Sequence, residues 1–406
     1  MAKKTGKGEF SFSKIGDIIK DISVKSNIIV DDSDGEGTFI GTGIYMLNAL
    51  FSKSILKGGV PTSRITALAG ESGVGKSYLC YNIAREAQKQ GYSVIYIDTE
   101  FSIQKQDLKN YGIDISDDRC KLLRSNKVEE IKVFLTQLLD QLKKAKADGY
   151  ELPKVILFLD SAGQLASRKE VEDAIEGKDK ADMSRAKAIK SLFRIINGDL
   201  GVLNIPMVVT NHTYFTQDFM PKEVMSGGTG LVYSASTIVF MSKAKLKTGE
   251  EDELDLSSSG IIVTAKSQKN RMAKPKKVKF HIDFSSGCNP YVGLDYFCTP
   301  ENFELVGVAQ GKVETNKIGE ARFIPGGNRW YVAHLNKSVT TNQLFSSKVF
   351  TPQVLEALEP IIYDYFKYSS STEIEQTEKE YEEMVAEEEK LYGTDLEEMD
   401  SDEFFN

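Results

Sequence analysis

The sequence has no long apolar run. No stretch of its 406 residues approaches the roughly 20 consecutive apolar residues that a membrane-spanning helix needs. The first residues, MAKKTGKGEFSFSK, also lack the apolar core of a secretory signal peptide. We therefore expect a cytoplasmic protein that does not associate with a membrane.

Cysteine is scarce, and its four positions carry no metal-binding pattern. Cys80, Cys120, Cys288 and Cys298 are scattered without the spacing of zinc ligands. This excludes a zinc-finger or disulfide-stapled domain, and it indicates reduced thiols that take part in packing.

Basic charge is scarce at one end of the chain. Residues 373–406 carry 15 acidic residues and only two lysines, whereas residues 1–372 carry 49 basic and 44 acidic side chains. A mildly basic body with an acidic tail is typical of a nucleic-acid binder whose tail competes for the binding groove. A disordered tail that only improves solubility would give the same pattern.

A phosphate-binding loop dominates what the sequence does contain. The segment GESGVGKS, residues 70–77, matches G-x-x-x-x-G-K-[ST] at every fixed position, after an apolar run and before a helical pattern. The residues predicted to bind the nucleotide here are Gly70, Glu71, Ser72, Gly73, Val74, Gly75, Lys76, Ser77 and Tyr78. The alternative is a chance glycine-rich turn before a helix.

The residue types of this loop suit a triphosphate. Gly73 and Gly75 allow the backbone to close around an anion, so that amide groups and the positive helix N-terminus face the phosphates. Lys76 adds a point charge at the β and γ positions, and Ser77 offers a hydroxyl to Mg²⁺. We therefore predict a nucleoside triphosphate site.

Apolar segments that alternate with helical patterns predict the fold class. The expected strands are 65–69, 94–98, 155–160, 207–211, 237–241 and 261–265, and the expected helices are 76–90, 104–111, 127–147 and 183–197. Near-continuous apolar strands alternating with helices indicate an α/β fold whose mostly parallel sheet is covered by helices on both faces. Ligands then bind at the carboxyl ends of the strands.

Carboxylates follow two of these strands. Asp160 ends the run VILFLD beside the phosphate loop, where it can hold Mg²⁺ through water, unless it only caps a turn. Asp98 and Glu100 end another run and point to the same side, because strand residues two apart share a face. We predict that Glu100 polarises the attacking water and that Asp98 braces the turn.

A third strand end, MVVTNHT, carries Asn211 and His212. Either side chain could donate a hydrogen bond to the γ-phosphate and so report its presence. A satisfied polar pair at a strand end is the alternative.

Two further segments are candidates for contact with DNA. Arg185, Lys187, Lys190 and Arg194 mark one helical stretch after the Asp160 strand, where they could contact phosphates or form a solvated face.

The second candidate, residues 213–230, is too apolar for a solvent loop and too irregular for a regular element. Its Phe215, Phe219 and Met220 could wedge between bases while Gly227 and Gly228 approach phosphates. Packing against a neighbouring subunit is the alternative.

The remaining segments complete four expected regions. Residues 1–38 hold an amphipathic helix, with its apolar face at Phe12, Ile15, Ile18, Ile19 and Ile22, and a linker. That face could pack on a neighbouring subunit or on the chain's own core. Residues 39–290 form the α/β core, residues 291–370 a small C-terminal region of short strands and a helix, and residues 371–406 the acidic tail.

Several segments together carry a family resemblance. They are GESGVGKS, YIDTEFSI, FLDSAGQLASRKE, DMSRAKAIKSLFRI, TNHTY, MSGGTG and the closing DEFFN. Because these segments occur together in this order, the chain resembles the RecA-family recombinases over about residues 40–290. Within that family it resembles the strand-exchange proteins of T4-like phages.

The resemblance implies a RecA-type P-loop ATPase core and a DNA-dependent ATPase with ATP and Mg²⁺ as ligands. Such a protein forms helical homo-oligomeric filaments on single-stranded DNA and exchanges strands with a homologous duplex, in recombination, repair and recombination-dependent replication. Single-strand-binding and mediator proteins are the expected partners, and the host cytoplasm is the expected location if a phage encodes the chain.

The resemblance also implies roles for single residues. Glu100 matches the catalytic carboxylate, and Asp160 the carboxylate that holds Mg²⁺ through water. His212 stands where relatives couple the γ-phosphate to the DNA loop. Lys269 and Arg271, in the segment KNRMAKP, match two cations that reach across the subunit interface to a neighbour's ATP.

One position departs from the family pattern. Asp107 stands where the family often has an aromatic residue that stacks on adenine, so adenine stacking and strict preference for ATP do not follow from the match.

Two other function classes remain open at this point. A ring-forming motor of the same fold, such as a helicase or branch-migration protein, would share the ATP site. A non-catalytic, ATP-gated assembly factor would bind protein partners instead of DNA.

Overall fold

The structure is a computed structural model, and it describes residues 37–177, 184–217, 219–245, 259–315 and 320–369. The described residues up to Phe366 belong to one compact unit, and a second unit begins at Lys367. The predicted N-terminal helix, residues 178–183 and the acidic tail lie outside the described residues.

A nine-stranded sheet forms the centre of the first unit, with the strand order β13-β12-β11-β10-β3-β7-β6-β4-β5. Its strands are β3 (Ile65–Gly70), β4 (Ser93–Asp98), β5 (Cys120–Arg124), β6 (Val155–Asp160), β7 (Met207–Asn211), β10 (Thr237–Lys245), β11 (Gly260–Asn270), β12 (Lys277–Asp283) and β13 (Gly287–Cys288). The six strands from β10 to β5 pair in parallel, and β11, β12 and β13 pair antiparallel.

The predicted fold class is confirmed, with one difference in topology. All six predicted strands lie in the sheet, but β11 returns antiparallel to β10. Strands β5 and β12 were not predicted. In both strands charged residues interrupt the apolar run, because the strands lie at or near the sheet edges and expose part of their surface.

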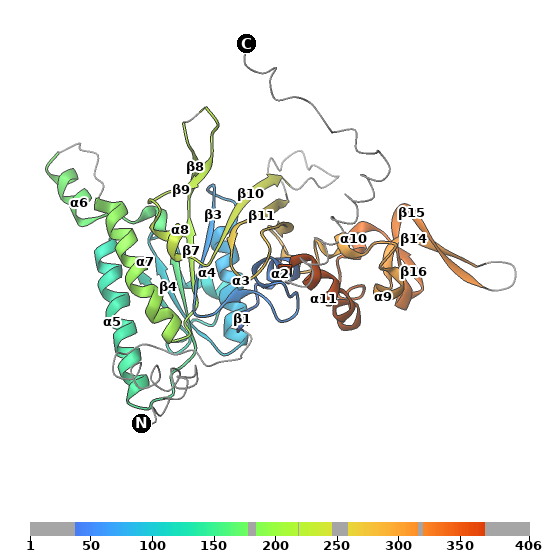
Figure 1. The fold of residues 1–406 in the computed structure, drawn as a ribbon, viewed down its shortest axis with the longest axis horizontal. Coiled ribbons are helices and arrows are strands. Elements are labelled where there is room, and N and C mark those ends of the chain that lie inside the picture. The colour runs from blue at the N-terminus through green and yellow to red at the C-terminus, as the bar shows by residue number, and fades with distance from the viewer. Residues whose placement is uncertain (1–36, 178–183, 218, 246–258, 316–319, 370–406) are drawn as a thin grey trace, which may run out of the picture. The chain divides into compact units, whose positions relative to one another are not determined.

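The helices lie on both faces of this sheet (Figure 1). They are α2 (Tyr45–Ser52), α3 (Lys76–Lys89), α4 (Lys105–Asn110), α5 (Val128–Ala147), α6 (Arg168–Ile175), α7 (Ser184–Val202) and α8 (Gly230–Ser234). Helix α6 was not predicted, because its sequence RKEVEDAI is largely charged and it buries no residue. Its first turn is held by a capping box between Ser167 and Glu170.

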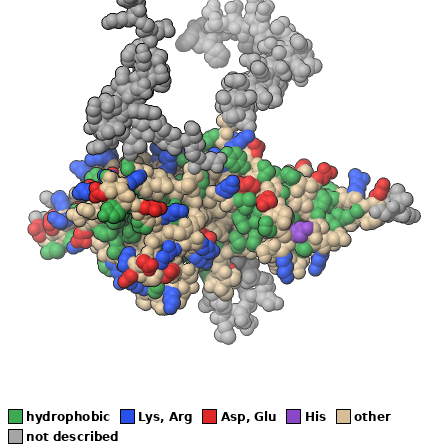
Figure 2. Space-filling model, turned by 90° about the horizontal axis from the view of Figure 1, so that it is seen from below, with side chains coloured by type: hydrophobic (Ala, Val, Ile, Leu, Met, Phe, Trp, Pro, Cys, Tyr) green, Lys and Arg blue, Asp and Glu red, His purple; other side chains and the backbone are tan. Residues whose placement is uncertain are grey.

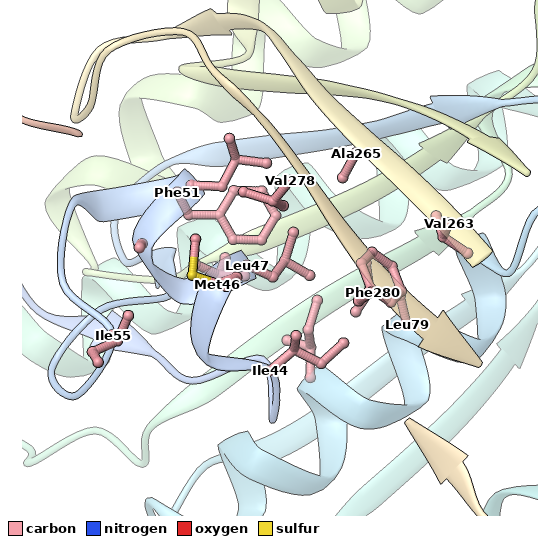
Figure 3. Packing of buried hydrophobic residues seen from close by; sticks show 14 of the residues in the cluster. Ile44, Met46, Leu47, Phe51, Ile55, Leu79, Val263, Ala265, Val278 and Phe280 are labelled. Carbon is pink, nitrogen blue, oxygen red and sulfur yellow. The ribbon is translucent and has the colours of Figure 1, made fainter. Parts of the chain in front are cut away.

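Helices α2 and α3 cover one face of the sheet. Figure 3 shows Leu47 and Phe51 of α2 beside Val278 and Phe280 of β12, all fully or almost fully buried. Leu79 of α3 belongs to the same cluster. This packing fixes the start of α3, which follows directly on the phosphate-binding loop.

Helices α5, α7 and α8 cover the other face. Leu135 and Leu139 of α5 pack in one apolar cluster with Leu192 and Phe193 of α7. The two helices run side by side in Figure 1. Helix α7 is thereby fixed against this face of the sheet.

The C-terminal region adds a three-stranded antiparallel sheet and further helices. Its elements are β14 (Val308–Thr315), β15 (Ala321–Val332), β16 (Lys337–Val339), α9 (Phe303–Val306), α10 (Thr341–Leu344) and α11 (Pro352–Phe366). Buried residues of this region, such as Leu358 and Phe366, belong to the same apolar cluster as α2 and α3. The predicted boundary at residue 290 therefore does not separate two hydrophobic cores.

Two short strand pairs complete the described part. Strands β1 (Phe39–Ile40) and β2 (Val60–Pro61) pair antiparallel, as do β8 (Thr213–Phe215) and β9 (Glu223–Met225). Figure 1 shows the β8–β9 hairpin projecting beyond the sheet.

The surface is mixed in charge. On the face drawn in Figure 2, basic and acidic side chains are interspersed. No helix in the described part of the chain is long and apolar enough to cross a membrane. All four cysteines are free thiols, and Cys80, Cys120 and Cys298 are buried, which agrees with their predicted packing role.

Candidate nucleotide site and nucleic-acid interface

The predicted phosphate-binding loop joins β3 to α3. Gly73 and Gly75 have φ angles of 71° and 92°, which favour glycine. A β-carbon on Gly75 would lie 2.5 Å from the Ile282 side chain of β12, so a larger residue would also clash there. The loop therefore needs both glycines in order to curl around an anion.

Lys76 is the first residue of α3 and lies inside this loop. Its side chain is only 7% exposed, and its Nζ donates to the carbonyl oxygens of Gly70 at 2.8 Å and Glu71 at 2.7 Å. Burial lowers the pKa of Lys76, while the nearby carboxylates of Asp160 and Glu100 oppose that shift. The ammonium group of Lys76 thus lies near Asp160 and Glu100, the carboxylates that were predicted to hold Mg²⁺ and to polarise the attacking water.

Asp160, at the end of β6, is buried and bonded through both carboxylate oxygens. Tyr96 OH donates to Oδ2 at 2.7 Å, and Thr210 Oγ1 donates to Oδ1. A carboxylate has about four acceptor positions, so these bonds fix its orientation and leave positions for a metal-bound water. The Ser77 hydroxyl forms no hydrogen bond to a described residue. Ser77 and Asp160 therefore fit the oxygen ligation that Mg²⁺ prefers.

Glu100 follows β4 and is held by neighbours on two sides. Glu100 N donates to Asp98 Oδ1 at 3.1 Å, and Ile103 N donates to Asp98 Oδ2 at 3.0 Å. Asp98 is completely buried and braces this turn, as predicted. The Ser161 hydroxyl donates to Glu100 Oε1 at 3.0 Å, which orients the carboxylate.

Three residues that support these carboxylates were missed by the sequence analysis. Tyr96 and Thr210 bond Asp160, and Ser161 bonds Glu100. Ser161 directly follows Asp160, so a hydroxyl beside the predicted metal-binding carboxylate was a usable signal. Tyr96 and Thr210 gave no signal, because each lies within a predicted strand.

His212 connects this carboxylate to the β8–β9 hairpin. Its Nε2 lies 3.4 Å from Glu100 Oε1. The carbonyl of His212 accepts a hydrogen bond from Ser226 N at 2.9 Å, which closes the base of the hairpin. One residue thus contacts both the predicted catalytic carboxylate and the predicted DNA loop.

Hydrogen bonds from the Asn211 side chain hold the other side of the hairpin base. Its Oδ1 accepts from Ser226 Oγ and from His212 N, each at 2.9 Å, and its Nδ2 donates to Ser226 O at 2.9 Å. The Asn211 amide is thus already used by these hydrogen bonds. The predicted contact with the γ-phosphate would have to be made beside them or replace one of them.

The second predicted DNA segment is more regular than expected. Residues 213–230 were predicted to be too irregular for a regular element, but the structure shows the β8–β9 hairpin. The alternation of side chains was hidden because both strands have only three residues. The predicted apolar residues are exposed near its tip, where Phe215 is 60%, Phe219 99% and Met220 73% exposed.

Gly227 and Gly228 pack against the start of α7. They have φ angles of 81° and 80°. A β-carbon on Gly227 would meet Ile189 at 3.2 Å, and one on Gly228 would meet Ala186 at 3.2 Å. The predicted approach of these glycines to phosphates would therefore compete with a packing role.

The four predicted cations of α7 separate into two groups. Lys187, Lys190 and Arg194 are exposed and recur at helical spacing on one face. Arg185 instead donates from Nε to Leu165 O at 2.5 Å and from its guanidinium to Gly163 O. A DNA contact of Arg185 would have to share these bonds, which join α7 to the segment after β6.

Lys269 and Arg271 lie at the opposite end of the sheet from the phosphate-binding loop. Met241 of β10 pairs with Gly70 and with Ala265, so Lys269 lies four residues, roughly 13 Å, further along β11. Lys269 Nζ donates to Val232 O at 2.8 Å, and burial followed by the charge of Arg271 lowers the pKa of Lys269. These cations cannot reach the loop of their own chain.

Asp107 serves as a helix cap. Its carboxylate accepts a hydrogen bond from Gln104 N at 3.1 Å, within a capping box at the start of α4. Tyr111, one turn later, packs against Tyr81 and Tyr78, with ring centroids 4.8 Å and 5.4 Å apart. The departure from the family pattern at position 107 thus has a local structural reason.

Comparison with known proteins identifies the family of the chain. Residues 38–289 match the family model of the RecA N-terminal domain. The chain belongs to the RecA family. The family predicted from the sequence is therefore confirmed, and the matched region includes every residue assigned to the nucleotide site.

Several RecA-family relatives align with this region. The "Recombination and repair protein" of Enterobacteria phage T4 is 35% identical over 263 residues, which are 64% of this chain and 63% of that protein. "Protein RecA" of Nitratiruptor sp. is 26% identical over 66% of this chain and 75% of its own length. The "Mitochondrial DNA repair protein recA homolog" of Dictyostelium discoideum is 27% identical over 57% of this chain and 48% of its own length.

The role of Glu100 can be tested by Glu100→Gln. The amide can still accept the Ser161 hydrogen bond but cannot polarise water, so we expect ATP turnover to fall by at least about 100-fold while nucleotide binding persists. Steady-state hydrolysis and equilibrium nucleotide binding measure the two effects. Glu356→Gln, an exposed change on α11, is the matched control. Rapid hydrolysis by the Glu100 variant would remove this residue from the catalytic role.

The two groups of α7 cations predict different effects on stability. Arg185→Ala removes hydrogen bonds to two backbone carbonyls, so we expect the free energy of unfolding to fall by about 1–3 kcal/mol. Lys187→Ala changes an exposed side chain of the same helix and should alter it by less than about 0.5 kcal/mol. Urea denaturation compares the variants, and equal stabilities would show that Arg185 does not brace the helix.

Proposed function

We propose that this chain is a DNA-dependent ATPase that forms helical filaments on single-stranded DNA. In this proposal the filament pairs with a homologous duplex and exchanges strands, in recombination, repair and recombination-dependent replication. One observation carries the proposal: the carboxylate of Glu100 and the imidazole of His212 meet at 3.4 Å, where the nucleotide site adjoins a hairpin with exposed apolar residues.

The nucleotide binds in the loop after β3. The backbone amides of this loop and the N-terminus of α3 favour the phosphates, and Lys76 exchanges its carbonyl partners for the β- and γ-phosphate oxygens. Ser77 and Asp160 would hold Mg²⁺, which supplies positive charge to the phosphates. Asp160 is kept in its orientation by Tyr96 and Thr210.

Hydrolysis depends on the orientation of Glu100. The Ser161 hydroxyl holds Oε1, and Asp98 fixes the turn beneath it. Glu100 therefore accepts a hydrogen bond from the attacking water in a set position, which is the role of a water-orienting residue in phosphoryl transfer. Ser161 acts as a positioning residue.

Nucleotide and DNA binding are coupled through His212. The imidazole lies beside Glu100, and its backbone closes the hairpin through Ser226 N. A γ-phosphate that bonds His212 would shift the hairpin toward the conformation that binds DNA. Linkage requires that each ligand then tightens the binding of the other.

The ATP site is shared between chains. Lys269 and Arg271 cannot reach the loop of their own chain, because they lie at the other end of β11. In a filament they would approach the triphosphate of the neighbouring protomer and neutralise charge that develops during hydrolysis.

DNA contacts come from two elements. The exposed apolar residues Phe215, Phe219 and Met220 suit stacking against or between bases. Lys187, Lys190 and Arg194 of α7 suit the phosphate backbone. The name of the T4 relative agrees with a role in recombination and repair. The proposed partner proteins and host-cytoplasmic location rest on the resemblance alone.

The most direct test of this function combines two measurements on the full chain. We expect ATP hydrolysis to increase several-fold when single-stranded DNA is added, and electron microscopy with ATP and that DNA to show helical filaments. Closed rings would favour the alternative of a RecA-fold motor. If ATP turnover did not change when DNA was added and no polymer formed, the chain would fit an ATP-gated assembly factor. That result would overturn the proposal.

The charge on α7 gives a second prediction. Replacing Lys187, Lys190 and Arg194 by Gln should weaken binding to single-stranded DNA and reduce the slope of log affinity against log salt, by roughly 0.7 for each phosphate contact that is lost. Fluorescence anisotropy over a salt series measures this slope. An unchanged slope would show that this face is only solvated.

A further inference from the structure

Strand β10 extends beyond the phosphate-binding loop. Its Met241 pairs with Gly70, the last residue of β3, and β10 continues to Lys245. Lys243 lies two residues after Met241, so its side chain projects from the same face of the sheet. Met241 belongs to the apolar cluster that contains Leu79 of α3. Lys243 therefore lies on the face that carries the phosphate-binding loop.

Lys243 contacts the tip of that loop directly. Its Nζ donates to Ser72 O at 3.0 Å, and a β-carbon on Gly73 would lie 3.0 Å from the same nitrogen. Lys76 Nζ donates to the two preceding carbonyls, those of Gly70 and Glu71. Two ammonium groups thus bind three consecutive carbonyls of one loop.

The two cations differ in local compensation, because Lys76 lies beside the carboxylates of Asp160 and Glu100. Lys243 is exposed and forms no ion pair with any residue in the described ranges. Its charge contributes to the lowered pKa of Lys76, after the larger effect of burial. A bound polyanion relieves this repulsion, and it does so more strongly as the anion's charge increases.

We propose that Lys243 is a second cation of the same chain that contacts the terminal phosphate and makes the loop prefer ATP over ADP. An ammonium group has three donors, so Lys243 can keep its bond to Ser72 O while it donates to a phosphate oxygen. In P-loop NTPases the backbone of this loop and its Lys cradle the β- and γ-phosphates, so a cation at the loop lies near the terminal phosphate. The inference rests on the proposed function only in that the loop must bind a nucleotide.

A purely structural role makes a different prediction. If Lys243 only braces the Ser72 carbonyl, its loss should weaken ATP and ADP binding to the same extent, because both nucleotides use the loop. A charge that acts on the terminal phosphate affects ATP selectively. The ratio of the two affinities therefore separates the two roles.

The experiment compares Lys243→Ala, Lys243→Gln and Lys243→Arg in the full chain, without DNA and with Mg²⁺. Gln retains a hydrogen-bond donor but not the charge, whereas Arg retains both. The matched control is Lys266→Ala, which removes a cation from the other face of the same sheet, since Lys266 pairs with Phe240. Competition with a fluorescent nucleotide gives the Kd of ADP and of a slowly hydrolysed ATP analogue.

We expect the Ala and Gln variants to bind the ATP analogue about tenfold more weakly, with the Kd of ADP changed by less than about twofold. Lys243→Arg and Lys266→Ala should retain the wild-type ratio. An equal loss for both nucleotides, or no loss for either, would overturn the proposal.

Two controls distinguish a loss of ATP selectivity from unfolding of the variants and from failure of the proposed function. Thermal unfolding midpoints of the Ala and Gln variants should match the wild type, and a loss of fold in both would show that Lys243 is structural. If the wild-type chain bound neither nucleotide, the proposed function would fail. A wild-type chain that binds ATP, with variants that keep its preference over ADP, would overturn the role of Lys243 alone.

Discussion

The hydrogen-bonded position of one carboxylate governs the site. Glu100 is held by the Ser161 hydroxyl at 3.0 Å and faces the His212 imidazole at 3.4 Å. These three residues follow β4, β6 and β7, which are adjacent in the sheet and parallel. Parallel strands end at the same edge, so residues far apart in sequence meet beside the phosphate-binding loop.

The same edge joins the nucleotide site to the candidate DNA surface. The segment after β6 accepts hydrogen bonds from Arg185 of α7, and the residues after β7 form the base of the β8–β9 hairpin. Gly227 and Gly228 then pack against α7. A displacement of His212 by a bound phosphate would therefore be transmitted to both elements that carry candidate DNA contacts. This physical continuity supports the coupling that the proposed function requires.

Much of this could be predicted from sequence, because local patterns determine it. The phosphate-binding loop, the six apolar strands and the carboxylates at their ends follow from motif and periodicity, and the family assignment followed from the same segments. Features that depend on tertiary contacts were missed. Each of these features joins residues that are distant in sequence. They are the hydrogen bonds from Tyr96 and Thr210 to Asp160, those from Arg185 to backbone carbonyls, and the contact of Lys243 with the loop. The β8–β9 hairpin was missed because three-residue strands show too little alternation.

The central claim is that the γ-phosphate and DNA are bound in one linked equilibrium through Glu100 and His212. The most direct measurement is the affinity of the full chain for single-stranded DNA at fixed ionic strength, with a slowly hydrolysed ATP analogue and separately with ADP. The account predicts clearly tighter DNA binding with the ATP analogue, by at least about fivefold, which is the lower range of allosteric coupling. Equal affinity in the two nucleotide states would contradict it.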